Sequence, residues 1–195
     1  VIQPRLKGRS FIVRYADDFV LGFERAEDAK RVMKVLFKRF EKYYLQLHPD
    51  KTRMVNLNNP ERGNRSFDFL GFTHYMGKSR KGKPVLKRKT SKKKYSNALN
   101  NMNEWLKRNR HNKIRDIIHD LNVKLRGYYN YYGITFNSRR LAGYFHEIKV
   151  LLHKWLNRRG GKPTWNWERF TKLVNLWCPL LSPRIYHSYL SAKPN

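Results

Sequence analysis

The sequence predicts an α+β protein, with a strand-rich first half followed by a basic three-helix bundle. Over residues 10–23, apolar residues alternate with their neighbours, which is the two-residue period of β strands. After residue 92, apolar residues recur at steps of three and four, as on one face of an amphipathic helix. The chain has 195 residues, with 43 Lys and Arg against 14 Asp and Glu, and a formal net charge of +29. This surplus favours a polyanionic partner, either nucleic acid or an acidic membrane surface.

The strand-rich half is expected to contain a hairpin, a helix and two further strands. Residues 10–23 form the hairpin, with the acidic pair of the sequence at its turn. A helix is expected over residues 26–45, and Pro49 prevents it from continuing. The two further strands are expected at residues 52–57 and 66–75.

The next stretch, residues 76–94, differs in composition, because ten of its nineteen residues are Lys or Arg and none is acidic. A basic connector is expected over residues 76–92, with room for a short hairpin around Val85 and Leu86, since Gly77, Gly82 and Pro84 interrupt any helix. Beyond it the apolar period becomes helical. Helices are expected at residues 93–109, 114–132 and 138–156.

Composition excludes several classes of protein. The single cysteine, Cys178, rules out an internal disulfide framework and a zinc site built on cysteine pairs. No apolar run approaches the roughly 18 residues that a membrane-spanning helix requires. The first residues lack both an initiator Met and the apolar core of a signal peptide. We therefore expect this chain to be the C-terminal part of a longer protein.

The most informative motif is the run from Tyr15 to Asp18, which places two adjacent carboxylates at the expected hairpin turn. Mg²⁺ prefers oxygen ligands and is commonly held by one or two carboxylates together with substrate phosphates. Asp is also an ordinary turn residue, because its side chain hydrogen-bonds to nearby backbone. The pair alone therefore leaves both a metal site and a structural turn open.

Four segments, in this order, resemble reverse transcriptases of group II introns. Residues 11–23 resemble the Tyr-x-Asp-Asp hairpin, in the Tyr-Ala-Asp-Asp form that group II intron and retron enzymes use. Residues 45–52 resemble the palm segment that follows it, and residues 67–72 resemble the primer-grip hairpin. Residues 125–133 resemble the thumb, or maturase-specific domain, of group II intron proteins. The fold then expected is the C-terminal half of a reverse transcriptase palm followed by a basic three-helix thumb bundle.

On this resemblance the chain divides into four parts. Residues 1–75 are the second half of the palm and residues 76–92 are the basic connector. Residues 93–160 are the helical thumb or maturase domain, and residues 161–195 are a tail that is a candidate DNA-contacting segment. In this tail, charge alone suggests Arg184 and His187 as nucleic-acid contacts.

The resemblance implies roles for residues of the palm. It makes Asp17 and Asp18 catalytic metal ligands, and Lys51 a proton donor to the leaving pyrophosphate or a phosphate contact. The family's first catalytic aspartate lies well upstream of the hairpin and is not in this chain, and neither are the fingers. The two-ion Mg²⁺ site is therefore expected to be completed from outside these residues. The remaining implied positions, which bind the nucleotide or the primer, are Tyr15, Ala16, Leu70 and Gly71.

A basic face is expected to bind nucleic acid, since phosphate contacts position a duplex without reading its sequence. Two aromatic rings, Tyr129 and Tyr131, are expected either to stack on bases or sugars or to pack within the protein, while Tyr128 and Tyr132 continue the apolar stripe of their helix. The expected nucleic-acid contacts are Lys87, Arg88, Lys89, Lys92, Lys93, Lys94, Arg126, Tyr129, Arg139 and Arg140.

The function implied is an RNA-directed DNA polymerase of a group II intron, which also binds intron RNA to assist splicing and retrohoming. Its expected partners are intron RNA, a template–primer duplex, deoxynucleoside triphosphates and a DNA target, with no membrane. Its expected location is the bacterial cytoplasm, at the nucleoid when bound to target DNA; the oligomeric state is left open. Two alternatives remain: a non-catalytic RNA-binding splicing maturase, and another bacterial reverse transcriptase of CRISPR-associated or retron type.

Overall fold

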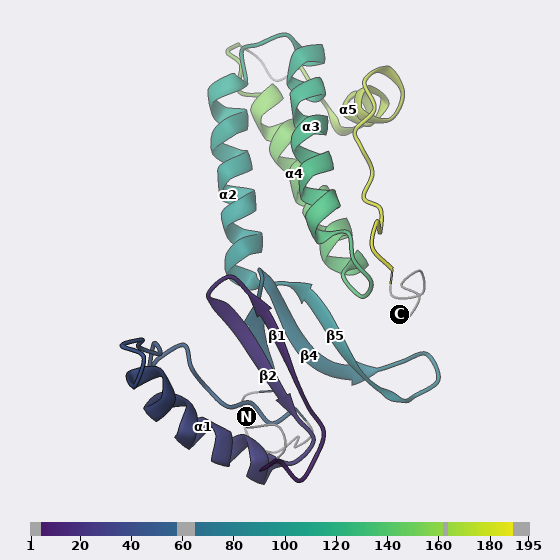
Figure 1. Ribbon diagram of the computed structural model, residues 1–195. Coiled ribbons are helices and arrows are strands. Elements are labelled where there is room, and N and C mark those ends of the chain that lie inside the picture. Colours follow the sequence, from purple (N-terminus) through teal and green to yellow (C-terminus); the bar gives the residue numbers. More distant parts are fainter. Residues whose placement is uncertain (1–4, 58–64, 162–163, 189–195) are drawn as a thin grey trace. The chain divides into compact units, whose positions relative to one another are not determined.

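The computed structural model describes residues 5–57, 65–161 and 164–188 (Figure 1). It is an α+β fold, as predicted, with antiparallel pairing in its first sheet and helices in its second half. The chain forms two compact units. The first comprises Val1–Leu70 with His74–Leu86, and the second comprises Gly71–Thr73 with Lys87–Asn195.

The first unit begins with a two-stranded ribbon, as the alternating pattern predicts. Strands β1 (Ser10–Tyr15) and β2 (Asp18–Phe23) pair antiparallel, with Tyr15 opposite Asp18 next to the turn. Helix α1 (Ala26–Glu41) follows, and its Phe40 ring lies 6.0 Å from the Phe19 ring of β2. The ribbon is thus held by backbone pairing along its length and by a helix packed on β2.

Buried Asp28, in the first turn of α1, anchors the segment that leads into the ribbon. Its carboxylate accepts hydrogen bonds from the backbone nitrogens of Lys7, at 3.0 Å, and Gly8, at 2.9 Å. A carboxylate in the first helical turn also interacts favourably with the positive end of the helix dipole. Asp28 therefore stabilises both the helix start and the entry to β1.

Two expectations for the residues after this ribbon are wrong. The helix expected to reach residue 45 ends at Glu41, because Tyr44 adopts a left-handed backbone with φ of +56°. Residues 52–57 form no strand; the preceding turn is instead closed by bonds from the backbone nitrogens of Lys51 and Thr52 to the carbonyl of His48. Apolar alternation over so short a stretch does not distinguish a strand from extended coil.

The second sheet has the strand order β3 (Ser66–Phe69), β4 (Phe72–Lys78) and β5 (Pro84–Thr90). The single strand expected at residues 66–75 is instead a hairpin, because Leu70 and Gly71 both have positive φ, at +49° and +76°. Two successive left-handed residues are the requirement of a type I′ turn. Leucine rarely adopts this conformation, so only Gly71 of the two central residues is of a type that indicates such a turn.

Part of the basic stretch that was expected to be a connector is the strand β5. The turn before it is closed by the backbone nitrogen of Ser79, which donates to the carbonyl of Lys83 at 2.8 Å. The Ser79 hydroxyl accepts from the Lys83 nitrogen at 3.0 Å, and Gly82 supplies the positive φ of +75°. The basic side chains of residues 84–90 are therefore carried by an ordered strand.

The helices match the periodic pattern closely. Helices α3 (Ile114–Tyr132) and α4 (Ser138–Leu156) have the predicted bounds, and α2 (Lys92–Asn109) begins one residue earlier than expected. Beyond them lie α5 (Trp167–Lys172) and the π-helical turn η2 (Leu173–Trp177). No helix in the part of the chain that the structure describes is both long and apolar enough to cross a membrane.

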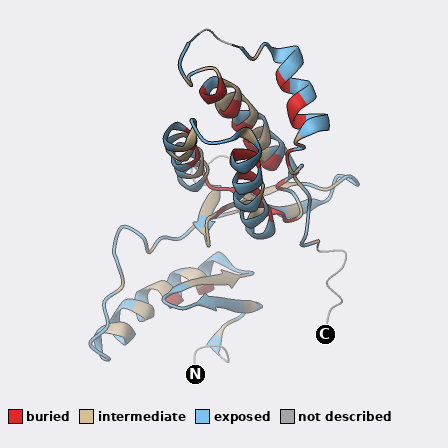
Figure 2. Ribbon diagram, turned by 90° about the horizontal axis from the view of Figure 1, so that it is seen from above, coloured by how far each residue is buried: buried red, intermediate tan, exposed pale blue. Residues whose placement is uncertain are grey.

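The core of the second unit lies among these helices, and Figure 2 shows its buried residues on their inward faces. Leu121, Leu125, Ile148 and Leu152 have no exposed surface. Burying a leucine or isoleucine side chain contributes about 1.5–3 kcal/mol each. The buried residues of this core are Met102, Leu106, Ile117, Ile118, Leu121, Leu125, Tyr129, Leu141, Tyr144, Ile148, Leu152, Trp155, Leu156, Phe170, Leu173, Val174 and Leu180.

Candidate nucleic-acid interface and carboxylate turn

The turn between β1 and β2 presents the acidic pair to solvent. Asp17 occupies the turn and Asp18 opens β2, and both side chains are exposed. Within the described residues, neither carboxylate makes a hydrogen bond or an ion pair. The nearby guanidinium of Arg14 donates instead to the Ala16 carbonyl, at 2.8 Å. Both carboxylates are therefore available to a cation.

The backbone of this turn is strained at Ala16, whose φ is +51°. A left-handed conformation costs a residue with a Cβ about 1 kcal/mol, and glycine is the usual choice at such a position. Strain of this kind concentrates at functional sites, where the surrounding structure maintains it. Here the paired strands on both sides maintain it.

The two carboxylates suit Mg²⁺ in chemistry, because both offer the oxygen ligands that this ion prefers. In the described residues, however, no three His, Cys, Asp or Glu side chains lie close enough together to hold a metal ion. A magnesium site at this turn would therefore need ligands in addition to these two carboxylates.

The other palm residues lie at separate places in the fold. Tyr15 ends β1 and is 66% exposed. Lys51 is exposed in the turn that follows Pro49, and in the described part of the chain it makes no hydrogen bond or ion pair with Asp17 or Asp18. The roles of Tyr15, Ala16 and Lys51 stay predictions.

The turn at Leu70 and Gly71 is tied to the helical unit through Gly71. The Gly71 carbonyl accepts a hydrogen bond from the Ser91 backbone nitrogen at 3.0 Å, immediately before α2. A Cβ added to Gly71 would lie 3.1 Å from the hydroxyl oxygen of Tyr132. Glycine is therefore required here by both its positive φ and this close packing, and a primer-binding role for Leu70 and Gly71 stays a prediction.

Two buried side chains join the start of α2 to the start of α4. The Asn137 carbonyl oxygen accepts from the Thr90 backbone nitrogen at 2.9 Å, and the Asn137 amide donates to the Thr90 hydroxyl at 2.9 Å. The same amide donates to the Tyr132 carbonyl at 2.8 Å. Both Thr90 and Asn137 have no exposed surface. We call this pair the Thr90–Asn137 clamp.

The clamp brings together five of the basic residues expected to contact nucleic acid. The first turns of α2 and α4 contain no acidic residue. The Arg140 guanidinium lies 5.0 Å from the centre of the Tyr95 ring, so the first turn of α4 contacts that of α2. We call these basic residues the helix-start cluster: Lys92, Lys93, Lys94, Arg139 and Arg140.

The electrostatics of the helix-start cluster favour an anion. A helix N-terminus carries a partial positive charge and unpaired backbone N–H groups, so cations placed there are unfavourable and anions are stabilised. In the described structure, the one side-chain cap at these two helix starts is the bond from the Lys94 backbone nitrogen to the Ser91 hydroxyl, at 3.4 Å. Two adjacent helix starts with five basic side chains, and no acid in either first turn, therefore form a strongly positive surface.

The remaining expected contacts are dispersed. Lys87, Arg88 and Lys89 are half-buried on β5, and burial lowers the pKa of Arg88. The Lys87 ammonium lies 5.5 Å from the centre of the Phe136 ring. Arg126 is exposed on α3, away from the clamp in sequence, and lines a cavity with Arg184.

The expectation that Tyr129 stacks on bases is wrong, because its ring is fully buried. Leu121, Leu125 and Tyr129 follow at steps of four and have no exposed surface, so they form one stripe of α3. This spacing was visible in the sequence and indicates a core position. The exposed ring of this run is Tyr131, which is 53% exposed and stacks on Phe72 at 5.7 Å.

Tyr129→Phe is expected to raise the free energy of unfolding at pH 7 by about 1 kcal/mol, because a buried hydroxyl without a partner costs about that much. In the described residues the Tyr129 hydroxyl is buried and has no hydrogen-bond partner. Urea denaturation measures the change, with Tyr43→Phe as the control, since Tyr43 is 60% exposed. A destabilised Tyr129→Phe protein would mean that the hydroxyl has a partner.

The same substitution should alter stability at high pH. Burial, followed by smaller effects of Tyr128 and Tyr186, raises the pKa of Tyr129 above its ordinary value of 10.0. The unfolded chain therefore releases the Tyr129 phenolic proton at a lower pH than the folded chain does. The contribution of this group to the free energy of unfolding is fully present below pH 10 and is lost as the pH rises above 10. Above pH 10, the free energy of unfolding should fall with pH for the wild type more steeply than for Tyr129→Phe. The two slopes should differ by about 1.4 kcal/mol per pH unit.

Comparison with known families supplies independent information on both halves of the chain. Residues 2–74 match the family model "Reverse transcriptase (RNA-dependent DNA polymerase)". Residues 85–173 match the model "Group II intron, maturase-specific domain". No curated protein matches the chain. The first match contains the acidic turn, and the second contains helices α2, α3 and α4. Together the two matches show that the chain belongs to the reverse transcriptase and maturase family of group II introns.

Proposed function

We propose that this protein is an RNA-directed DNA polymerase of a group II intron, and that its helical unit binds intron RNA to assist splicing and retrohoming. The two family matches imply nucleic-acid partners such as intron RNA. The net charge of +29 agrees with a polyanionic partner. In this proposal the helices also contact the template–primer duplex, and the intron RNA inserted at a DNA target is copied into DNA.

The observation that carries the RNA-binding part is the helix-start cluster. A-form duplexes are recognised through their shape, their phosphates and their 2′-hydroxyl groups rather than through their bases. Exposed lysines in the first turn of α2, together with Arg139, offer cations and helix N-termini to phosphates at one place. The buried clamp at Thr90 and Asn137 keeps the two helix starts together.

Removing charge from the helix-start cluster should therefore lower the affinity for RNA and also make that affinity less dependent on salt concentration. For the triple variant Lys92→Ala, Lys93→Ala, Arg139→Ala we expect the slope of log affinity against log salt to become shallower by about 2, at about 0.7–0.9 per lost phosphate contact. Filter binding or fluorescence anisotropy with intron RNA, over a series of salt concentrations, measures this slope.

A matched triple variant removes the same charge elsewhere on the helices. Lys107, Arg108 and Arg115 are exposed and lie outside the cluster. Their replacement by alanine should change the slope much less. Equal effects of the two triple variants would mean that net charge alone drives binding, and would contradict an RNA site at the helix starts.

The polymerase part of the proposal assigns Asp17 and Asp18 as ligands of Mg²⁺, with a further carboxylate contributed from outside the described residues. When bound, such ions stabilise the attacking and leaving oxygens of phosphoryl transfer. The turn holds both carboxylates exposed at the end of a paired ribbon. Lys51 would contact the triphosphate or protonate the leaving pyrophosphate, as a compact cation can.

A second candidate function is a splicing maturase that binds intron RNA without polymerising DNA. It is supported by the match of residues 85–173 to the maturase-specific domain, which lies outside the residues that match the reverse transcriptase model. Mg²⁺-dependent primer extension on an RNA template by the full-length protein separates the two. Extension supports the polymerase, whereas tight binding of intron RNA without extension supports the maturase alone.

A further inference from the structure

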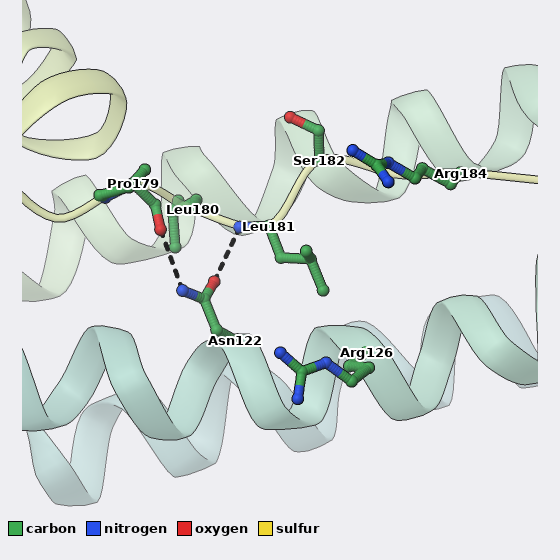
Figure 3. A pocket seen from close by; sticks show the side chains of 7 residues that line it. All are labelled: Asn122, Arg126, Pro179, Leu180, Leu181, Ser182 and Arg184. Atoms are coloured by element: carbon green, nitrogen blue, oxygen red, sulfur yellow. Dashed lines mark hydrogen bonds between the residues drawn. The ribbon is translucent and has the colours of Figure 1, made fainter.

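The segment after η2 lies along α3 in an extended conformation and is attached by the side chain of Asn122. The Asn122 amide donates to the Pro179 carbonyl at 2.9 Å, and its carbonyl oxygen accepts from the Leu181 backbone nitrogen at 2.8 Å (Figure 3). Both polar groups of one helical side chain are thus used to hold the backbone of a segment almost sixty residues away in sequence.

A second attachment lies at the end of α3. The Gly133 carbonyl accepts from the backbone nitrogens of Tyr186, at 2.7 Å, and His187, at 2.9 Å. A Cβ on Gly133 would lie 2.6 Å from the Arg184 carbonyl oxygen, so only glycine allows this approach. The segment after η2 is therefore attached to α3 near Pro179 and again near His187.

Between these attachments α3 and the segment line an open cavity of about 280 Å³. Figure 3 shows that its two guanidinium groups come from opposite sides, Arg126 from α3 and Arg184 from the extended segment. None of the lining residues is acidic. The cavity is lined by Asn122, Arg126, Pro179, Leu180, Leu181, Ser182 and Arg184.

Neither guanidinium is neutralised within the described residues. Arg126 and Arg184 make no hydrogen bond or ion pair there, and the Ser182 hydroxyl is likewise unused. A guanidinium has five donors in a planar fork that matches the oxygens of a phosphate. Two such groups across one cavity, with a hydroxyl beside them and apolar walls from Pro179 and Leu181, suit a phosphate and its attached sugar.

We propose that Arg126 and Arg184 bind a phosphodiester of a nucleic-acid strand in this cavity, with the attachment at Asn122 holding Arg184 in place. The Arg184 side of the cavity lies beyond residue 173, where the match to the maturase-specific domain ends. The site is separate from the helix-start cluster and does not depend on its role. It gives the segment after η2 a function in binding that depends on its docked conformation.

The test is the binding of a short fluorescein-labelled oligouridylate, and of the matching oligothymidylate, to the full chain by anisotropy. Arg126→Ala with Arg184→Ala is expected to weaken binding at least tenfold and to reduce the salt slope by about 1.4, for two contacts at about 0.7 each on a single strand. The control pair Arg108→Ala with Arg115→Ala removes the same charge from exposed positions outside the cavity. Equal losses in the two pairs would overturn the site.

Asn122→Ala distinguishes a formed site from a merely charged surface, because it keeps both guanidiniums and removes the two bonds that position the segment. We expect Asn122→Ala to weaken oligonucleotide binding several-fold relative to the wild type. Unchanged binding would overturn the role of the docked segment. A preference for one oligonucleotide assigns the strand as RNA or DNA. Displacement by equimolar inorganic phosphate would indicate a free-anion site and overturn the nucleic-acid assignment. Measuring the helix-start triple variant in parallel separates failure of this site from failure of the proposed RNA interface.

Discussion

Asp17→Ala in the full-length protein is expected to reduce Mg²⁺-dependent DNA synthesis on an RNA template by about 10³-fold or more, since metal ions supply several kcal/mol of transition-state stabilisation. The loss should occur without weaker binding of intron RNA, because the Asp17 carboxylate is exposed in a turn of the first unit, whereas the proposed RNA-binding residues belong to the second unit. Primer extension and RNA anisotropy on the same preparation measure the two effects.

Two further variants decide whether the turn acts through its charge or through its shape. Asp17→Asn keeps the size and turn preference of the side chain and removes its charge, so it should lose synthesis as fully as Asp17→Ala. Glu41→Ala removes an exposed carboxylate at the end of α1 and should retain synthesis. Full activity of Asp17→Asn, or parallel losses of synthesis and RNA binding in Asp17→Ala, would assign the turn a structural role.

Asn137→Ala is expected to lower the free energy of unfolding of the helical unit by about 3 kcal/mol, since each buried polar group left without its partner costs about 1–3 kcal/mol. The substitution removes three hydrogen bonds and takes the Asn137 partner from the buried nitrogen and hydroxyl of Thr90, while the Tyr132 carbonyl keeps its bond from the Ile134 nitrogen. Urea denaturation followed by circular dichroism measures the change.

Asn101→Ala is the matched control, because Asn101 is exposed on α2 and makes no hydrogen bond in the described residues. It should change stability by less than about 0.5 kcal/mol. Asn137→Asp retains the acceptor for the Thr90 nitrogen but cannot donate to the Tyr132 carbonyl, so it should also destabilise. Asn137→Ala with a stability equal to that of Asn101→Ala would show that the clamp contributes nothing.

Local periodicity was sufficient for most of the secondary structure. The bounds of α3 and α4, and the β1–β2 ribbon with its acidic turn, follow from patterns that repeat within a few residues. Periodicity does not predict the turn at Leu70 and Gly71, because leucine rarely adopts positive φ, whereas the resemblance of residues 67–72 to the primer-grip hairpin does indicate a hairpin there. Tyr129 was misassigned although the four-residue step from Leu125 indicates burial.

The fold class, the family resemblance and the residue types of both candidate sites could be predicted from the sequence, because they depend on composition, period and short motifs. Which basic residues lie together depends instead on the folded arrangement of the chain. Thr90 and Asn137 are 47 residues apart, and Asn122 contacts a segment 57 to 59 residues away. Such pairings depend on how the helices pack against one another, which cannot be predicted from the periodicity of a short sequence segment. The helix-start cluster and the Arg126–Arg184 cavity therefore became visible only in the folded chain.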